Sequence, residues 1–235
     1  MRKYLIILIL AFLFSSCKLI YHTAPKYLKN YGFTFRYTDT VSGLEKKLNI
    51  NGYYTINDTL NSGYIYGRYT NMIFFRDGMF ISGFHNCCDT NSDHIGKVIP
   101  MYLDSISAKR KNGTRVYPFY EGFIWGYYKL CGDTIKVQHI DRPSLGESRS
   151  FWYAYEIWFK ILDRNTIKEI YIYPIHKTTD SDISNFNSYN KNCIPVKAYF
   201  RPIDEIPESD GWLKYEDWFW DNKSKYNNWI NRTKK

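Results

Sequence analysis

The feature that most constrains this chain is a series of short aromatic and β-branched runs, which residues typical of turns separate. The run 151–162 shows the pattern best: its odd positions are all apolar or aromatic, whereas its even positions include Glu156 and Lys160. Successive side chains on a strand point to opposite faces, so this alternation predicts a strand with one buried face. Aromatic and β-branched side chains suit a pleated, half-buried sheet, and the chain is therefore expected to be mainly β.

Turn residues join these runs in pairs. The strongest hairpin signal is Asp77-Gly78, which stands between the runs 64–75 and 79–84. The other predicted hairpins pair 119–130 with 134–140 and 151–162 with 166–173, and further strands are expected at 48–56 and 196–200. Consecutive hairpins build a meander. We therefore predict an antiparallel meander that forms a strongly curved sheet or a lipocalin-like barrel, with a C-terminal helix packed on it.

The C-terminal segment 207–235 has a different character. A turn at Pro207–Gly211 precedes a Trp-rich stretch in which aromatic residues recur at roughly helical spacing. The favoured interpretation is a helix that packs on the sheet, because aromatic stripes at this spacing usually pack. The alternative is an aromatic platform for a sugar or a peptide. Its candidate ligand-binding residues are Trp212, Trp218, Trp220 and Trp229.

The N-terminus carries the pattern of an export signal. Arg2 and Lys3 precede an uninterrupted apolar run at 4–14, and the sequence Ser-Ser-Cys follows it. A membrane span needs about 20 apolar residues, so a run this short fits the hydrophobic region of a secretory signal instead. The small residues after the run are typical of a cleavage site for a signal peptidase.

The sequence 13–17, Leu-Phe-Ser-Ser-Cys, resembles the lipobox that ends a type II signal peptide in bacterial lipoproteins. The resemblance implies that the thiol of Cys17 is diacylated, that the signal peptide 1–16 is removed, and that the acyl groups anchor the chain in a membrane. The predicted organisation is then a lipidated tether at 17–30, an antiparallel β domain at 31–206 and the helical segment at 207–235. No Asp follows Cys17, and the expected location is the cell envelope, at the outer membrane facing the periplasm.

A wider set of motifs resembles a class of uncharacterised β-rich envelope lipoproteins. The motifs are Gly-Tyr-Tyr at 52–54 and 126–128, Gly-Asp-Thr-Ile at 132–135 and Trp-Phe-Trp at 218–220. That class carries no agreed activity, so the resemblance implies a location and a β-rich architecture only.

Four cysteines remain after Cys17, and an even number in an exported protein permits disulfides. The candidates are Cys87, Cys88, Cys131 and Cys193. Adjacent cysteines rarely meet disulfide geometry, so each of the first two is expected to pair with a later one, or only one of them does. The alternative for this region is a metal site with the ligands His85, Cys87, Cys88, Asp89 and His94. Their spacing matches no established zinc motif, so a disulfide or a polar loop is favoured.

Signatures of catalysis are missing from the sequence. It contains no Gly-x-Ser-x-Gly elbow, no phosphate-binding loop and no dinucleotide fingerprint, and no cofactor is predicted. His139 lies in a predicted strand and is interpreted as an edge or core histidine. The net charge is +9, but the basic run 109–111 is short, so a solvated loop is favoured there over contact with an anionic surface.

The sequence therefore predicts a lipid-anchored cell-envelope protein that acts as a non-catalytic binding module for an unknown ligand. An exported protein seldom meets nucleic acid, so no nucleic-acid partner is expected. One alternative is a structural or partner-binding protein of the outer membrane, which predicts an exposed aromatic patch. A second alternative is a metal-dependent enzyme that uses the cluster between His85 and His94.

Overall fold

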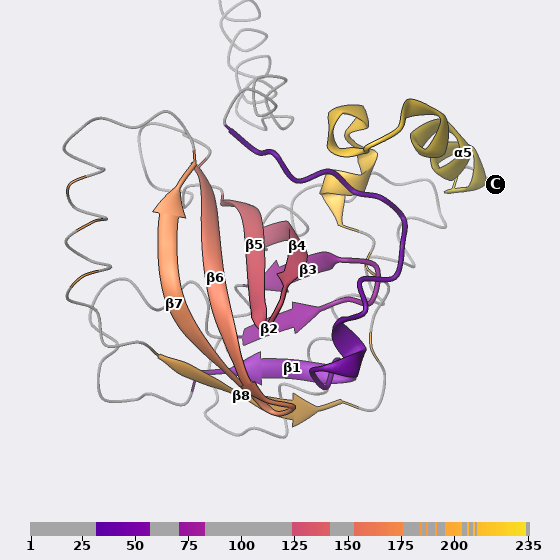
Figure 1. The fold of residues 1–235 in the computed structure, drawn as a ribbon. Coiled ribbons are helices and arrows are strands. Elements are labelled where there is room, and N and C mark those ends of the chain that lie inside the picture. The colour runs from indigo at the N-terminus through magenta and orange to yellow at the C-terminus, as the bar shows by residue number, and fades with distance from the viewer. Residues whose placement is uncertain are drawn as a thin grey trace, which may run out of the picture.

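The computed structural model describes residues 32–56, 71–82, 124–141, 153–175, 196–203 and 211–233, together with the single residues 184, 187, 191, 206 and 209. Its centre is a closed barrel of eight antiparallel strands in sequence order (Figure 1). The strands are β1 (Gly52–Thr55), β2 (Asn71–Phe74), β3 (Met79–Ser82), β4 (Ile124–Cys131), β5 (Thr134–Asp141), β6 (Tyr153–Asp163), β7 (Thr166–Pro174) and β8 (Lys197–Pro202). The predicted antiparallel meander is confirmed, and of the two forms predicted for it the chain adopts the barrel.

The barrel closes because β8 pairs with β1, where Gly52 lies opposite Pro202 and Thr55 lies opposite Tyr199. Each of the described strands therefore has a hydrogen-bonded neighbour on both sides, which leaves no open edge among them. Strand twist turns the sheet as it closes, and Figure 1 shows the long strands β5, β6 and β7 steeply inclined to β1, β2 and β3. No helix within the described ranges is long and apolar enough to cross a membrane.

Three tight turns at one end of the barrel confirm the predicted hairpins. Between β2 and β3, Gly78 adopts a φ of 90°, a left-handed value that favours glycine. A side chain there would also collide with Tyr127, because a Cβ atom would lie 2.5 Å from its ring. Turns at 132–133 and 164–165 join β4 to β5 and β6 to β7.

Alternation along each strand divides the apolar residues into two cores, one inside the barrel and one outside it. On β4, the side chain of Tyr128 faces the lumen, whereas that of Tyr127 faces out. The ring centroid of Phe74 lies 5.2 Å from that of Phe80 and 6.0 Å from that of Phe159, so aromatic rings meet across the lumen. The lumenal core comprises Leu44, Leu48, Ile50, Tyr54, Met72, Phe74, Phe80, Ile124, Tyr128, Ile135, Val137, Ile157, Phe159, Ile167, Ile172 and Ala198.

A short 3-10 helix, η2 (Leu44–Lys46), closes the end of the barrel that carries the tight turns. Leu44 and Leu48 are fully buried in the lumenal core. Shortly after η2, the N–H of Asn49 donates a hydrogen bond to the carbonyl of Arg164 in the β6–β7 turn at 2.9 Å. This bond holds the segment that contains η2 against the end of the barrel. At the opposite end lie the last residues of β1, β3, β5 and β7.

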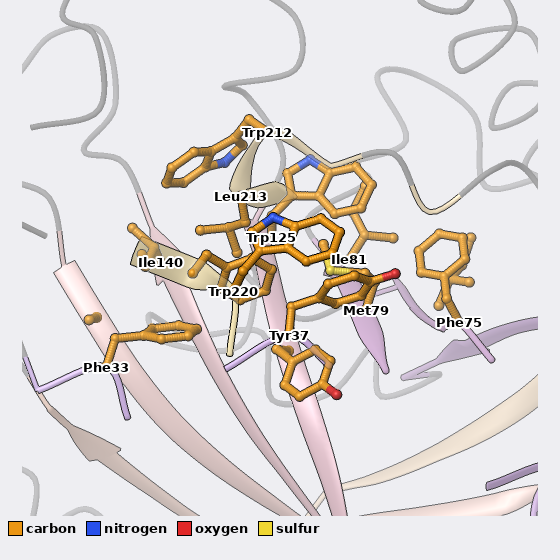
Figure 2. Close-up of a cluster of buried hydrophobic side chains, with 14 of the residues drawn as sticks. Phe33, Tyr37, Phe75, Met79, Ile81, Trp125, Ile140, Trp212, Leu213 and Trp220 are labelled. Carbon is orange, nitrogen blue, oxygen red and sulfur yellow. The ribbon is translucent and has the colours of Figure 1, made fainter. Parts of the chain in front are cut away.

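The outer core lies between the barrel wall and the C-terminal segment (Figure 2). That segment forms η4 (Trp212–Tyr215), η5 (Asp217–Phe219) and α5 (Lys223–Thr233). Figure 2 shows Trp125 of β4 among Trp212, Leu213 and Trp220 of this segment. The predicted helix packed on the sheet is confirmed, but it is limited to α5, since the extended backbone of Glu216 (φ −95°, ψ 117°) separates two 3-10 turns before it.

Residues 33–37 run along the outside of the barrel and complete the outer core. Tyr37 forms a parallel bridge with Trp220, so the N-terminal and C-terminal segments lie side by side. On β5, Oε1 of Gln138 accepts two backbone N–H groups of the N-terminal segment, at 2.8 and 2.9 Å. Among the described members of the outer core none belongs to β7 or β8, and these two strands keep an outward face that this layer does not cover.

Candidate functional site

Most of the site residues predicted from the sequence lie outside the described part of the chain. They are Cys17, His85, Cys87, Cys88, Asp89, His94 and Cys193. Cys131 is described: it ends β4 on the surface and forms no disulfide with another described residue. Within the described ranges, no group of three or more potential metal ligands comes together.

The four candidate tryptophans lie in the C-terminal segment, where most of their ring surface is covered. Trp212, Trp220 and Trp229 are more than nine-tenths buried in the outer core, and Trp218 is partly exposed. Nε1 of Trp220 donates a hydrogen bond to the carbonyl of Lys214 at 2.8 Å. This burial supports the packing interpretation, because an aromatic platform needs accessible ring faces.

Besides tyrosines, the described residues that face the lumen include a histidine and a carboxylic acid, His139 and Glu169. His139 is fully buried and its ring stacks on Tyr155 with centroids 5.5 Å apart, so the core interpretation of this histidine is confirmed. Glu169 is 8% exposed, and its carboxyl group forms no hydrogen bond or ion pair with a described residue. Burial away from water raises the pKa of Glu169 from 4.5 to about 7.

An ion pair between the buried Lys214 and the partly exposed Asp77 joins the C-terminal segment to the β2–β3 turn. Nζ of Lys214 lies 2.7 Å from Oδ2 of Asp77 and 2.8 Å from Oγ of Ser209. The hydroxyl of Tyr37 donates to Asp77 at 2.9 Å, and burial, followed by the charge of that carboxylate, raises the pKa of Tyr37. Lysine, serine and carboxylate groups can support acid–base chemistry, but these bond to one another and join two segments of the chain. Their geometry fits a structural role.

The outer wall of β6, β7 and β8 carries three lysines in a row. Lys160 on β6 lies opposite Lys168 on β7, which in turn lies opposite Lys197 on β8. Directly opposed side chains on neighbouring strands have Cβ atoms about 5 Å apart, so the three ammonium groups share one strip of surface. None of the three forms an ion pair with a described residue. We call these residues the lysine row.

An aromatic strip, made of Trp158, Tyr171 and Tyr173, borders the lysine row. The ring centroid of Trp158 on β6 lies 4.9 Å from that of Tyr171 on β7, and the ring of Tyr171 stacks on that of Tyr173 at 6.2 Å. Nζ of Lys136 lies 3.7 Å from the ring centroid of Trp158, in a cation–π contact. Glu156 lies beside the strip, and its Oε1 accepts a hydrogen bond from Nε1 of Trp158 at 2.6 Å.

The lysine row is electrostatically unfavourable by itself, because like charges directly opposite each other destabilise a sheet. Lysine on a strand often protects a sheet edge, but the described strands form a closed barrel and leave no edge to protect. A hydrogen bond from Lys47 at 2.7 Å and, to a smaller extent, the charge of Lys160 lower the pKa of Asp133, so this nearby carboxylate is already engaged. An anionic partner would relieve the repulsion within the row.

The lysine row was not predicted from the sequence, because the row depends on an irregular register between β6 and β7. A regular hairpin with its turn at 164–165 would place Lys160 opposite Glu169, an attractive pair. In the structure Leu162 has no opposite residue, and the register beyond it shifts by one. Lys160 consequently faces Lys168, and Glu169 turns into the lumen.

Comparisons of the chain with protein-family models, with curated proteins and with solved structures found no match. The candidate site is therefore defined by physical properties of the chain itself. On one wall of the barrel, cations without an ion-pair partner among the described residues lie beside partly exposed aromatic rings.

Proposed function

We propose that this protein is a lipid-anchored cell-envelope protein that binds an anionic partner on the outer wall of its barrel, without catalysing a reaction. The observation that carries the proposal is the lysine row, in which three ammonium groups on adjacent strands have no ion-pair partner among the described residues. The export signal and the lipobox ending at Cys17 support the anchor.

The outer wall suits binding better than the lumen does. Inside the barrel, the rings of Phe74, Phe80 and Phe159 meet across the lumen, and η2 closes one end. Outside, the lysine row and the aromatic strip lie on strands that are paired on both sides. Paired strands hold their side chains at fixed spacing, which lowers the entropic cost of binding a partner.

The residue types on this wall define the chemistry of the partner. Lysine ammonium groups bind phosphate, sulfate or carboxylate groups as point charges. Adjacent lysines in the row belong to neighbouring strands, so the partner should present several anionic groups separated by about 5 Å. The rings of the aromatic strip add apolar contact area beside these charges.

The test is the binding of the full-length protein, kept in detergent, to immobilised heparin as a soluble polyanion. Replacing Lys160, Lys168 and Lys197 by Gln removes the charges of the lysine row and keeps comparable side-chain length. A matched control removes three exposed cations from other parts of the molecule, with the substitutions Lys46→Gln, Lys223→Gln and Arg232→Gln. Circular dichroism of both variants checks that the barrel has folded.

We expect the lysine-row variant to elute from heparin at lower salt than the control variant. The slope of log affinity against log salt should flatten by about 2–3 for the lysine-row variant, since each lost contact removes roughly 0.7–0.9. The control variant should keep most of the wild-type slope of log affinity against log salt. Equal losses in the two variants would mean that net charge governs binding, and the proposal would fail.

A further inference from the structure

We infer that the anionic partner is a phospholipid bilayer, which the outer wall of β6, β7 and β8 contacts directly. This inference rests on the proposed function and names the partner of the same surface. It depends on three observations: exposed apolar side chains beside the lysine row, the sign of the charge on this wall, and the point at which the N-terminal chain reaches the barrel.

Apolar side chains flank the lysine row on both sides. Four large hydrophobic side chains are exposed among the described residues, and three of them lie on this wall: Leu162, Ile170 and Tyr199, with exposed fractions of 45%, 42% and 41%. Leu162 and Tyr199 follow the row along β6 and β8, and Ile170 lies on its other side along β7. A soluble polyanion offers apolar side chains no partner, whereas a bilayer presents anionic headgroups next to acyl chains.

A β-bulge places Ile170 on this face. Glu169 lies opposite Phe159, and Tyr171 lies opposite Trp158, which leaves Ile170 without an opposite residue. Bulges re-aim side chains, and this one exposes an isoleucine between the lysine row and the aromatic strip. Trp and Tyr are enriched where proteins meet the headgroup layer, because their rings are amphipathic. The aromatic strip therefore adds to the features that suit a bilayer.

The charge of the wall complements an anionic bilayer. Arg201 on β8 is exposed and extends the positive surface beyond the lysine row. Glu156 accepts a hydrogen bond from the indole of Trp158 and lies four residues before Lys160 on β6. A lysine near an anionic membrane surface raises the affinity about fivefold, so the three lysines of the row should contribute about a hundredfold.

The predicted anchor can reach this wall. Gly32, where the described chain begins, packs against the carbonyl of Ile175 directly after β7, and a Cβ atom there would lie 2.3 Å from that oxygen. Figure 1 shows this start of the chain near the upper ends of β6 and β7. The stretch from Cys17 to Gly32 spans at most about 50 Å when extended. The distance along β7 from Ile175 to Lys168 is about 23 Å, so acyl groups on Cys17 reach a bilayer that lies along this strand.

Lysine footprinting of the full-length lipidated protein tests the inference at single residues. The protein is reconstituted into vesicles of phosphatidylcholine, or of phosphatidylcholine mixed with phosphatidylglycerol. A water-soluble acetylating reagent then modifies exposed lysines, and mass spectrometry measures the rate for each. We expect Lys160, Lys168 and Lys197 to react about tenfold more slowly in the anionic vesicles than in the neutral ones. Lys46 and Lys223, which are exposed elsewhere, should react at the same rate in both.

Equal rates for the lysine row in the two kinds of vesicle would overturn the inference. The same footprinting of the detergent-solubilised protein with added heparin distinguishes a failure of the bilayer inference from a failure of the proposed function. Protection by heparin but not by anionic vesicles would refute the bilayer and leave the proposed function standing, whereas protection by neither would refute both.

A second variant tests the apolar contribution. Replacing Leu162 and Ile170 by Ser should weaken the protection of the lysine row in anionic vesicles and leave heparin binding unchanged, because only the bilayer offers acyl chains to these side chains. Undiminished protection in this variant would count against the bilayer. Both side chains are exposed, so these substitutions leave the lumenal core intact.

Discussion

The buried carboxyl group of Glu169 leads to a quantitative prediction of how the stability of the barrel depends on pH. Its carboxyl group faces the lumen, is 8% exposed and forms no hydrogen bond or ion pair with a described residue. An ionised carboxylate is costly in such surroundings, because burial removes its hydration and no cation among the described residues pairs with it. Glu169→Gln keeps the size and polarity of the side chain but cannot ionise. We therefore expect this substitution to stabilise the protein at alkaline pH.

The magnitude follows from the pKa, which burial raises from 4.5 to about 7. Between these two values the unfolded chain has released the proton while the folded chain still holds it, so the folded state loses stability as the pH rises. A difference of this size corresponds to about 3 kcal/mol, lost progressively between the two pKa values and constant above the folded one. The Gln variant lacks this loss.

Urea denaturation of the full-length protein measures the effect. Near pH 8 the free energy of unfolding of Glu169→Gln should exceed that of the wild type by about 3 kcal/mol, or roughly 6–12 °C in melting temperature for a chain of this size. Near pH 5 the two should agree to within about 1 kcal/mol, because the folded wild type is then protonated. Asp217→Asn, which removes a carboxylate from the exposed surface, is the matched control.

Three outcomes separate the explanations. A difference between the wild type and Glu169→Gln that does not change with pH would refute the reasoning. A variant that loses stability at both pH values would show that the carboxylate has a favourable partner in the folded protein. The same pH dependence in Asp217→Asn would assign the effect to net charge and not to burial.

Two further predictions concern the outer core and the N-terminus. Lys214→Met should lower the free energy of unfolding by about 2–3 kcal/mol, because it leaves the Asp77 carboxylate without its buried cation. Lys225→Met removes a surface pair with Asp221 and a hydrogen bond to the carbonyl of Thr38, and it should cost less than Lys214→Met, about 1 kcal/mol. Equal costs in urea melts would contradict the structural role of the Lys214–Asp77 pair. Cys17→Ala should leave an unprocessed precursor that takes up no labelled fatty acid in cells; normal processing of this variant would rule out the lipoprotein prediction.

Much of the fold was predictable because strands and turns depend on residues that are close together in the chain. Alternation over 151–162 predicts the strand that the structure places at Tyr153–Asp163. The pair Asp77-Gly78 predicts the β2–β3 turn, where Gly78 adopts the left-handed backbone that such a turn needs. The Trp-rich tail predicts a helix packed on the sheet, although two 3-10 turns separated by the extended backbone of Glu216 precede it and the α-helix is limited to α5.

The sequence alone did not predict whether the curved sheet closes into a barrel. A curved sheet and a barrel share the same alternation and the same turns, and they differ only in whether the last strand meets the first. In this chain Gly52 lies opposite Pro202, and a Cβ atom at Gly52 would lie 2.1 Å from the carbonyl of Arg201. The glycine permits the close approach, but its role is visible only once the two strands are together.

The candidate site depended on tertiary structure even more strongly. The members of the lysine row are isolated in sequence, and a regular hairpin would have paired Lys160 with Glu169. The irregularity at Leu162 changes that register. Side chains alternate with a period of two, so each shift of one residue moves a side chain to the opposite face. The sequence alone therefore determined where strands and turns form. Hydrogen bonds between strands set the register, and only the register decided that three lysines share the outer wall while the carboxylate faces the lumen.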